Sequence, residues 1–117
     1  MNGVKVKFLD RDEILQGLKS RARQLLTSNS EVLEVSLFGS LARGNYAPGS
    51  DADLYILLKH HPGNWIDRIP EFLLHFSGIG VPVEVFPYTV EELVNMGDTG
   101  FIQSIQKEKI VLASWSD

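Results

Sequence analysis

The sequence predicts an α/β (α+β) protein with a small mixed β-sheet of three to four strands covered by helices. Two observations carry this fold class. Helical and strand-like apolar patterns follow one another along the chain, with no internal repeat or low-complexity tract between them. Apolar residues make up 44% and charged residues 22% of the 117 residues, which is typical of a globular protein. The length suits one domain, and we expect residues 1–117 to form it.

The first predicted elements are a helix and a strand. Asp10 and Glu13 have the spacing of a capping box, which indicates a helix start. Apolar residues then recur on one helical face to about residue 27: Ile14, Leu15, Leu18, Ala22, Leu25 and Leu26. In residues 32–38, apolar and polar side chains alternate, as they do in a strand. Residues 39–50 are rich in turn residues and leave room for one short helical turn.

The second strand is predicted at residues 51–58, and its mostly apolar sequence favours a central place in the sheet. Residues 64–77 have apolar residues at helical spacing, with a kink or a break expected at Pro70. Three aromatic residues of this helix are expected to face the core: Trp65, Phe72 and Phe76. If this helix is a crossover, the strands at 51–58 and 81–88 are parallel neighbours.

The last elements follow from capping signals. Thr89 and Glu92 form a second capping-box pair, which opens a short helix that Gly97 ends. A further helical segment is predicted near residues 99–107, and residues 110–113 can add an edge strand.

Charge and composition exclude several classes of protein. The chain has no cysteine, so disulfides, thiolate metal sites and a cysteine nucleophile are excluded. No apolar run approaches the roughly 20 residues of a membrane span. The first residues carry Lys5, Lys7, Asp10 and Asp12 where a signal peptide is apolar, so we expect a cytoplasmic protein without membrane contact. The net charge of −4 argues against direct nucleic-acid binding, and an acidic body needs a metal ion to bind a polyanion.

The first chemical feature is the pair Gly39-Ser40, where the first strand ends and a short helix begins. Glycine lets the backbone approach a phosphate closely, and free amides at a helix start attract an anion. An ordinary strand–helix turn is the alternative. A P-loop is excluded, because Asn45 and Tyr46 stand where its Lys and Ser/Thr are required. Arg43, one helical turn after Ser40, can reach a phosphate oxygen or lie in solvent.

The second feature is a set of three acidic residues. Asp51 and Asp53 open the second strand, where residues two apart point to the same face, about 6.5 Å apart along the chain. Glu84 lies within the apolar strand 81–88 and can approach Asp53 if the two strands are parallel neighbours. Hard oxygen ligands suit Mg²⁺, which would relieve the repulsion between these carboxylates. Alternatively, Asp51 caps a turn, Asp53 pairs with a surface cation and Glu84 faces solvent.

Together these features resemble the nucleotidyltransferase superfamily typified by DNA polymerase beta. The stretch LFGSLARGNYAPGSDADLYILL is similar to the signature of its minimal nucleotidyltransferases, which include antitoxin-type proteins related to kanamycin nucleotidyltransferase. The resemblance is tight over residues 35–58 and loose over 81–88, and with the preceding helix it covers about 80 residues. The third acid of the family is usually Asp, whereas this chain has Glu84.

The resemblance implies a single nucleotidyltransferase domain that uses two Mg²⁺ ions and a nucleoside triphosphate, with ATP expected. Asp51 and Asp53 would hold both ions, and Glu84 would bind one ion or accept the proton of the attacking hydroxyl. Gly39 and Ser40 would hold the β- and γ-phosphates. Small relatives often act as antitoxins beside a helical HEPN-type protein, and some transfer AMP to a tyrosine of that partner. We therefore expect AMP transfer to a partner protein.

Two other readings remain. The chain can be a non-catalytic module of the same fold that neutralises a HEPN-type partner by contact, and Glu84 in place of Asp favours this slightly. It can also be an unrelated phosphate-binding α/β domain, if the three acids prove to be dispersed.

Overall fold

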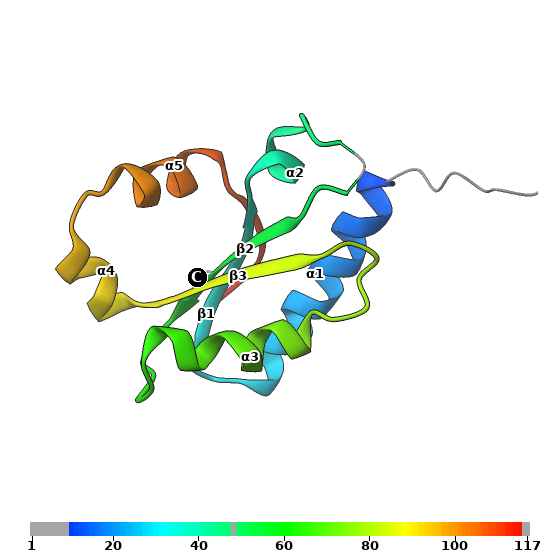
Figure 1. Cartoon of the computed structure of the whole chain (residues 1–117). Helices are drawn as coiled ribbons and strands as arrows, with labels where there is room; N and C mark the ends of the chain where they lie inside the picture. The colour runs from blue at the N-terminus through cyan, green and yellow to red at the C-terminus, as the bar shows by residue number, and fades with distance from the viewer. Residues whose placement is uncertain (1–9, 48, 116–117) are drawn as a thin grey trace, which may run out of the picture.

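A mixed four-stranded sheet organises the part of the chain that the computed structural model describes, residues 10–47 and 49–115. Its strands are β1 (Val32–Phe38), β2 (Ala52–Leu58), β3 (Val83–Thr89) and β4 (Ile110–Ser114), in the order β3-β2-β1-β4 (Figure 1). β1 pairs antiparallel with β2 and β4, whereas β2 and β3 are parallel. The predicted mixed sheet, the central position of the second strand and the parallel pair are therefore confirmed. The ends of the predicted domain, residues 1–9 and 116–117, lie outside the described residues, as does residue 48.

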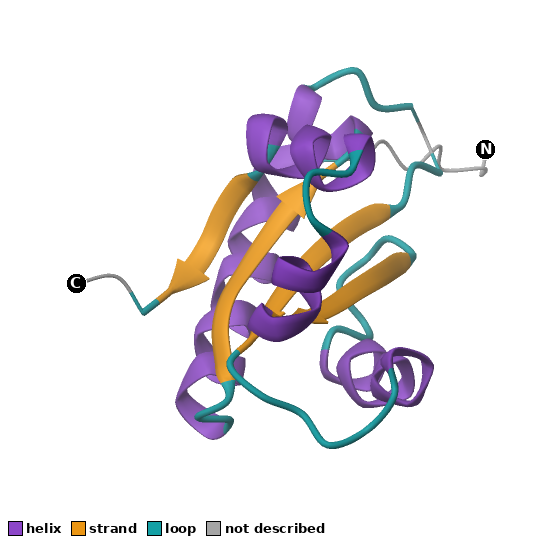
Figure 2. Cartoon of the chain, turned by 90° about the vertical axis from the view of Figure 1, so that its left-hand side faces the viewer, coloured by secondary structure: helices purple, strands orange, loops and turns teal. Residues whose placement is uncertain are grey.

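Helices cover both faces of this sheet (Figures 1 and 2). The helices are α1 (Arg11–Ser28), α2 (Ser40–Arg43), α3 (Trp65–His75), α4 (Val90–Met96) and α5 (Gly100–Glu108). α1 and α3 pack on one face and enclose the larger core, which includes Leu18, Leu54 and Phe72. α4 and α5 pack on the other face around Tyr55 and Ile105. None of the helices in the described ranges is long and apolar enough to cross a membrane.

Side-chain caps set the helix starts that the sequence predicts. Asp10 accepts a hydrogen bond from the Glu13 backbone N–H at 3.2 Å, where α1 begins. Thr89 and Glu92 form a complete capping box at α4, since each side chain accepts a hydrogen bond from the other residue's backbone N–H. Such caps satisfy amides that have no partner within the helix. The capping box predicted at Thr89 and Glu92 is confirmed, and at Asp10 and Glu13 the structure has the N-cap hydrogen bond of the predicted box.

Three details differ from the predictions. α3 runs unbroken through Pro70, so the predicted break is wrong. β2 begins at Ala52, which leaves Asp51 exposed just before the strand. Trp65 is half-buried and packs on Tyr88 with ring centroids 6.1 Å apart, outside the main core that holds Phe72 and Phe76. The reason is that Trp65 is the first residue of α3 and lies beside the end of β3, where α4 begins.

Candidate functional site

The turn between β1 and α2 has a backbone conformation that only glycine adopts readily. Gly39 has φ +82° and ψ −160° and is buried. A Cβ at this position would collide with Oδ2 of Asp53. Glycine is therefore required twice: for its backbone angles, and because the Asp53 carboxylate lies directly against its Cα.

Asp53 and Glu84 are brought together by the parallel pairing of β2 and β3, in which they are register partners. Residues paired in this way point to the same face of a sheet. The pKa of Asp53 is raised to about 6, chiefly by burial and then by the negative charges of Glu84 and Asp51 and a hydrogen bond with Glu84. Arg43 opposes this rise. The acids predicted from the sequence thus influence one another electrostatically at one end of the sheet.

The donor set fits a hard divalent cation only in part. Carboxylate oxygens are the ligands that Mg²⁺ prefers, and one or two protein carboxylates together with phosphates and waters satisfy it. The adjacent Asp53 and Glu84 meet that requirement. Within the described residues, however, no group of three or more histidine or acidic side chains is arranged to hold a metal ion. Asp51 therefore acts on Asp53 through its charge without completing a three-carboxylate group in this structure.

The backbone N–H of Gly39, which the sequence predicts to bind phosphate, is hydrogen-bonded to an acidic residue of α5. The Gly39 N–H donates a hydrogen bond to Oε1 of Glu108 at 3.1 Å. Nη1 of Arg43 donates to both oxygens of the same carboxylate, at 3.1 and 3.2 Å. Glu108 thus binds two of the groups that the sequence assigns to the nucleotide. From the other side, Arg11 donates to the carbonyls of Leu41 and Ala42 and fixes α2.

Glu108 is the residue of this site that sequence reasoning misses. It is the last residue of α5 and stands 69 positions from Gly39 and 65 from Arg43. No local pattern marks it, because a glutamate near a helix end is ordinary on a solvated surface. Only the packing of α5 on the sheet brings it to the turn. Ser40, the remaining predicted residue, is half-buried and opens α2.

The comparisons with known proteins decide the family. The family model described as "Nucleotidyltransferase domain" matches residues 13–112. The chain belongs to this family. The match spans every residue of the candidate site, from Gly39 to Glu108. No curated protein matches the chain significantly.

Solved structures share the fold of this nucleotidyltransferase domain. A candidate nucleotidyltransferase from Sulfolobus solfataricus is 22% identical, with a TM-score of 0.61, over 90% of this chain and 84% of that one. A toxin–antitoxin structure with AMP-PNP is 17% identical, with a TM-score of 0.55, over 91% and 74% of the two chains. A mutant of the MntA–HpeT toxin–antitoxin is 16% identical, with a TM-score of 0.53, over 92% and 74%. At these identities the likeness shows the fold.

Proposed function

We propose that this nucleotidyltransferase domain transfers a nucleoside monophosphate, AMP from ATP, to a hydroxyl of a partner protein in a Mg²⁺-dependent reaction. One observation carries the proposal: the Asp53 carboxylate, next to Glu84, lies against the glycine turn that begins α2. Transfer at the α-phosphate needs acids for a metal and donors for the leaving pyrophosphate side by side. The arrangement of Asp53, Glu84 and Gly39 supports this chemistry.

Each residue of the site has a role in this proposal. Asp53, Glu84 and, after a change in its side-chain conformation, Asp51 would hold two Mg²⁺ ions. The chemistry that the ions supply when bound is polarisation of the α-phosphate and neutralisation of the leaving pyrophosphate. The Gly39 N–H, the Ser40 hydroxyl and Arg43 would donate hydrogen bonds to the β- and γ-phosphates. Glu84 would bind one ion or accept the proton of the attacking hydroxyl.

Glu108 is expected to compete with the nucleotide for Gly39 and Arg43. Because Glu108→Gln keeps the shape and removes the charge, it weakens the contacts that a phosphate must displace. Arg43 is 46% exposed, so solvent limits the effect. We expect Mg²⁺-ATP to bind about threefold to tenfold more tightly, measured by calorimetry at fixed ionic strength.

The exposed Glu91→Gln, which removes the same charge from α4, is the matched control for the change in net charge. Its affinity should equal that of the unmodified chain. Unchanged or weaker binding by Glu108→Gln would show that Glu108 and the nucleotide do not share these donors.

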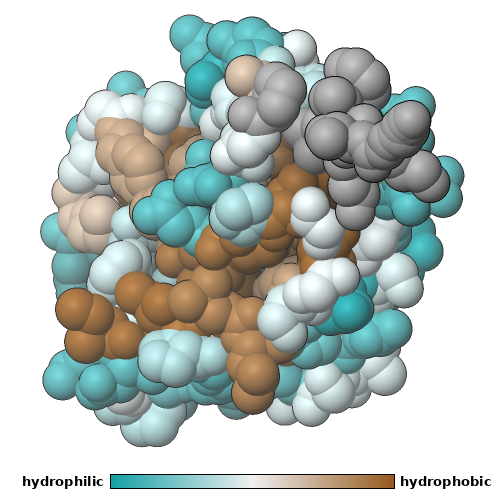
Figure 3. Space-filling view, turned by 45° about the vertical axis from the view of Figure 1, so that its right-hand side comes forward, coloured by the Kyte–Doolittle hydropathy of each residue, from teal (hydrophilic) through white to brown (hydrophobic). Residues whose placement is uncertain are grey.

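A partner protein is supported by the fold neighbours and by the surface. Two of the structures above are described as toxin–antitoxin assemblies. Figure 3 shows apolar side chains gathered in a band with hydrophilic margins. On α3, Ile66 and Leu74 are 69% and 76% exposed. Exposed apolar patches of this kind occur where proteins dock. We propose a helical HEPN-type protein as this partner.

The proposed function is tested with ATP that carries a label on either its α- or its γ-phosphate. With Mg²⁺ and the protein encoded beside this chain, α-phosphate label should appear on the partner with release of pyrophosphate, and γ-label should not. Asp53→Ala and Asp51→Ala should abolish the transfer, and Glu84→Ala should reduce it severely. Asp12→Asn, an exposed acid in the first turn of α1, is the control that should keep full activity. Transfer of γ-label would indicate a kinase and refute the proposal.

The alternative is a non-catalytic module that neutralises the same partner by contact. Two observations favour it: the described residues hold no group of three acids arranged for a metal, and Glu108 already binds the Gly39 amide. Tight partner binding without any α-label on the partner would decide for this alternative.

A further inference from the structure

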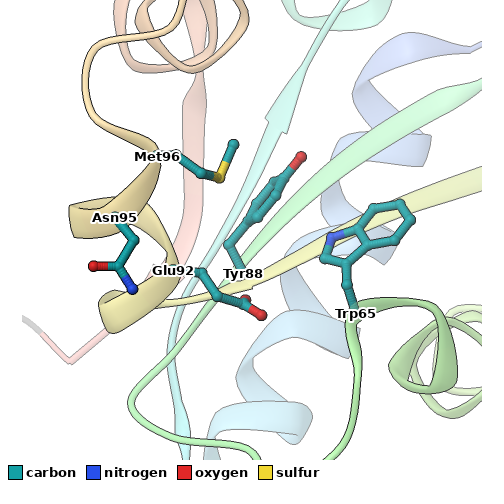
Figure 4. Close-up of a pocket in the computed structure, with 5 residues that line it drawn as sticks. All are labelled: Trp65, Tyr88, Glu92, Asn95 and Met96. Atoms are coloured by element: carbon teal, nitrogen blue, oxygen red, sulfur yellow. The ribbon is translucent and has the colours of Figure 1, made fainter.

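A pocket of about 340 Å³ lies beside the end of β3, where α3 and α4 approach each other. Figure 4 shows the five residues that line it: Trp65, Tyr88, Glu92, Asn95 and Met96. Its volume is at the lower end of the range of ligand sites, which are mostly apolar with a few polar groups. Two aromatic rings and a thioether with only two other polar side chains fit that description.

The Trp65 indole N–H is buried and has no hydrogen-bond partner. An indole nitrogen can only donate, and buried donors almost always have a partner. In Figure 4 the nitrogen stands on the side of the indole that faces Tyr88. The nitrogen is closed to solvent, so Trp65 offers the pocket its aromatic ring rather than a hydrogen-bond donor.

The opposite side of the pocket offers acceptors. Glu92 accepts hydrogen bonds from Nη1 and Nη2 of Arg68, at 2.6 and 2.9 Å, and its pKa falls to about 2 chiefly through the Arg68 hydrogen bonds. Its carboxylate is thus ionised. Asn95 adds an amide that can both donate and accept. A planar ring with a ring-nitrogen acceptor next to an amino donor matches this arrangement, and adenine carries such an edge.

The Arg68–Glu92 ion pair keeps the walls of the pocket in place before a ligand arrives. Arg68 is 2% exposed and also donates to the carbonyls of Pro87 and Gly63, at 3.2 and 2.8 Å. It thereby joins α3, the end of β3 and the start of α4. A preformed pocket loses less conformational freedom on binding.

The pocket shares a sheet face with the acids. Glu84 and Tyr88 are four residues apart in β3, so they point to the same side at a separation of about 13 Å. A hydroxyl that reacts at the acids cannot have its own aromatic ring in a pocket so far away. The base of a nucleotide takes no part in the reaction and lies at the opposite end of the molecule from the phosphates.

We propose that the pocket lined by Trp65, Tyr88 and Met96 binds the adenine base of the donor nucleotide, by stacking on an aromatic ring and by hydrogen bonds with Asn95 and Glu92. This inference rests on the proposed function for the identity of the nucleotide. It assigns base recognition to α3 and α4, and leaves the phosphates to the turn at Gly39.

The fluorescence of Trp65 can report on ligand binding in the pocket. The chain has two tryptophans, so Trp115→Phe leaves Trp65 as the only one. In this variant, metal-free adenosine should quench the emission of Trp65 saturably, whereas tripolyphosphate should not. Asn95→Ala should weaken adenosine binding about threefold to tenfold through the lost hydrogen bonds. Val94→Ala, 74% exposed on the same helix and outside the pocket, should leave the affinity unchanged.

The outcomes separate this proposal from the proposed function, because adenosine carries no phosphate and needs no metal. Quenching by adenosine that persists in Asp53→Asn supports the pocket even if no label is ever transferred. Mg²⁺-dependent ATP binding without any quenching by adenosine would overturn the pocket and leave the transferase reading intact. Quenching by N-acetyltyrosinamide alone would also overturn it, by assigning the pocket to a side chain of a partner protein.

Discussion

In the metal-free protein, Asp53→Asn is expected to raise the free energy of unfolding at pH 8 by about 1–2 kcal/mol. Burial and the charges of Glu84 and Asp51 raise the Asp53 pKa from 3.8 to about 6, so the ionised carboxylate destabilises the fold by at most about 3 kcal/mol. Solvent contact of the carboxylate lowers this figure. Asparagine removes the charge and can still donate to Glu84. Chemical denaturation with a chelator present measures the gain.

The gain should depend on pH with a definite sign. The folded protein keeps the Asp53 proton up to about pH 6, whereas the unfolded chain releases it near 3.8. The unmodified protein therefore loses stability as the pH rises through this window. The advantage of Asp53→Asn should be complete above about pH 6 and vanish below about pH 4. Asp98→Asn, an exposed acid between α4 and α5, should show no such dependence.

Adding Mg²⁺ should make the unmodified protein more stable than Asp53→Asn, which reverses their order in the metal-free state. A cation that binds only the folded state stabilises it by mass action, so the melting temperature of the unmodified protein should rise. Asp53→Asn should gain little, because it lacks a proposed ligand. An equal gain in both proteins would place the Mg²⁺ site elsewhere.

Gly39→Ala is expected to lower the free energy of unfolding by about 2–4 kcal/mol and to abolish nucleotide transfer. Alanine at φ +82° and ψ −160° is strained, and its Cβ would collide with the Asp53 carboxylate. Relief requires Asp53 or the turn to move, and either movement separates the acids from the phosphate donors. Thermal unfolding should show a decrease of about 10 °C or more.

Gly44→Ala separates the two causes. Gly44 ends α2 with φ +86°, and a Cβ there meets nothing within 4 Å, so alanine brings only the backbone strain. Its cost should be about 1 kcal/mol. In an Asp53→Ala background, Gly39→Ala should also cost less, because the colliding atoms are gone. Equal losses for Gly39→Ala in both backgrounds would mean that the carboxylate does not cause the destabilisation.

The sequence predicted those features that depend on neighbours along the chain. The capping pair Thr89–Glu92 acts over three residues, and the core-facing apolar residues of α1 repeat with the helical period. The parallel pairing of β2 and β3 follows from the crossover helix between them, and it makes Asp53 and Glu84 register partners. The turn at Gly39 and the Asp51–Asp53 spacing were visible for the same reason. The roles of these residues in metal and nucleotide binding stay predictions.

Tertiary structure alone decided what surrounds these residues. Glu108 reaches Gly39 across 69 positions, and Arg68 reaches Glu92 across 24, because α5 packs over the sheet and α3 lies beside the start of α4. Trp65 follows the helical apolar pattern of the core residues, yet its place at the first turn of α3 puts it against Tyr88. Periodicity records which side of an element is apolar, but not which distant element covers it. The local signals therefore identified the acids and the glycine turn, and the packing of α3, α4 and α5 added the competing carboxylate and the aromatic pocket.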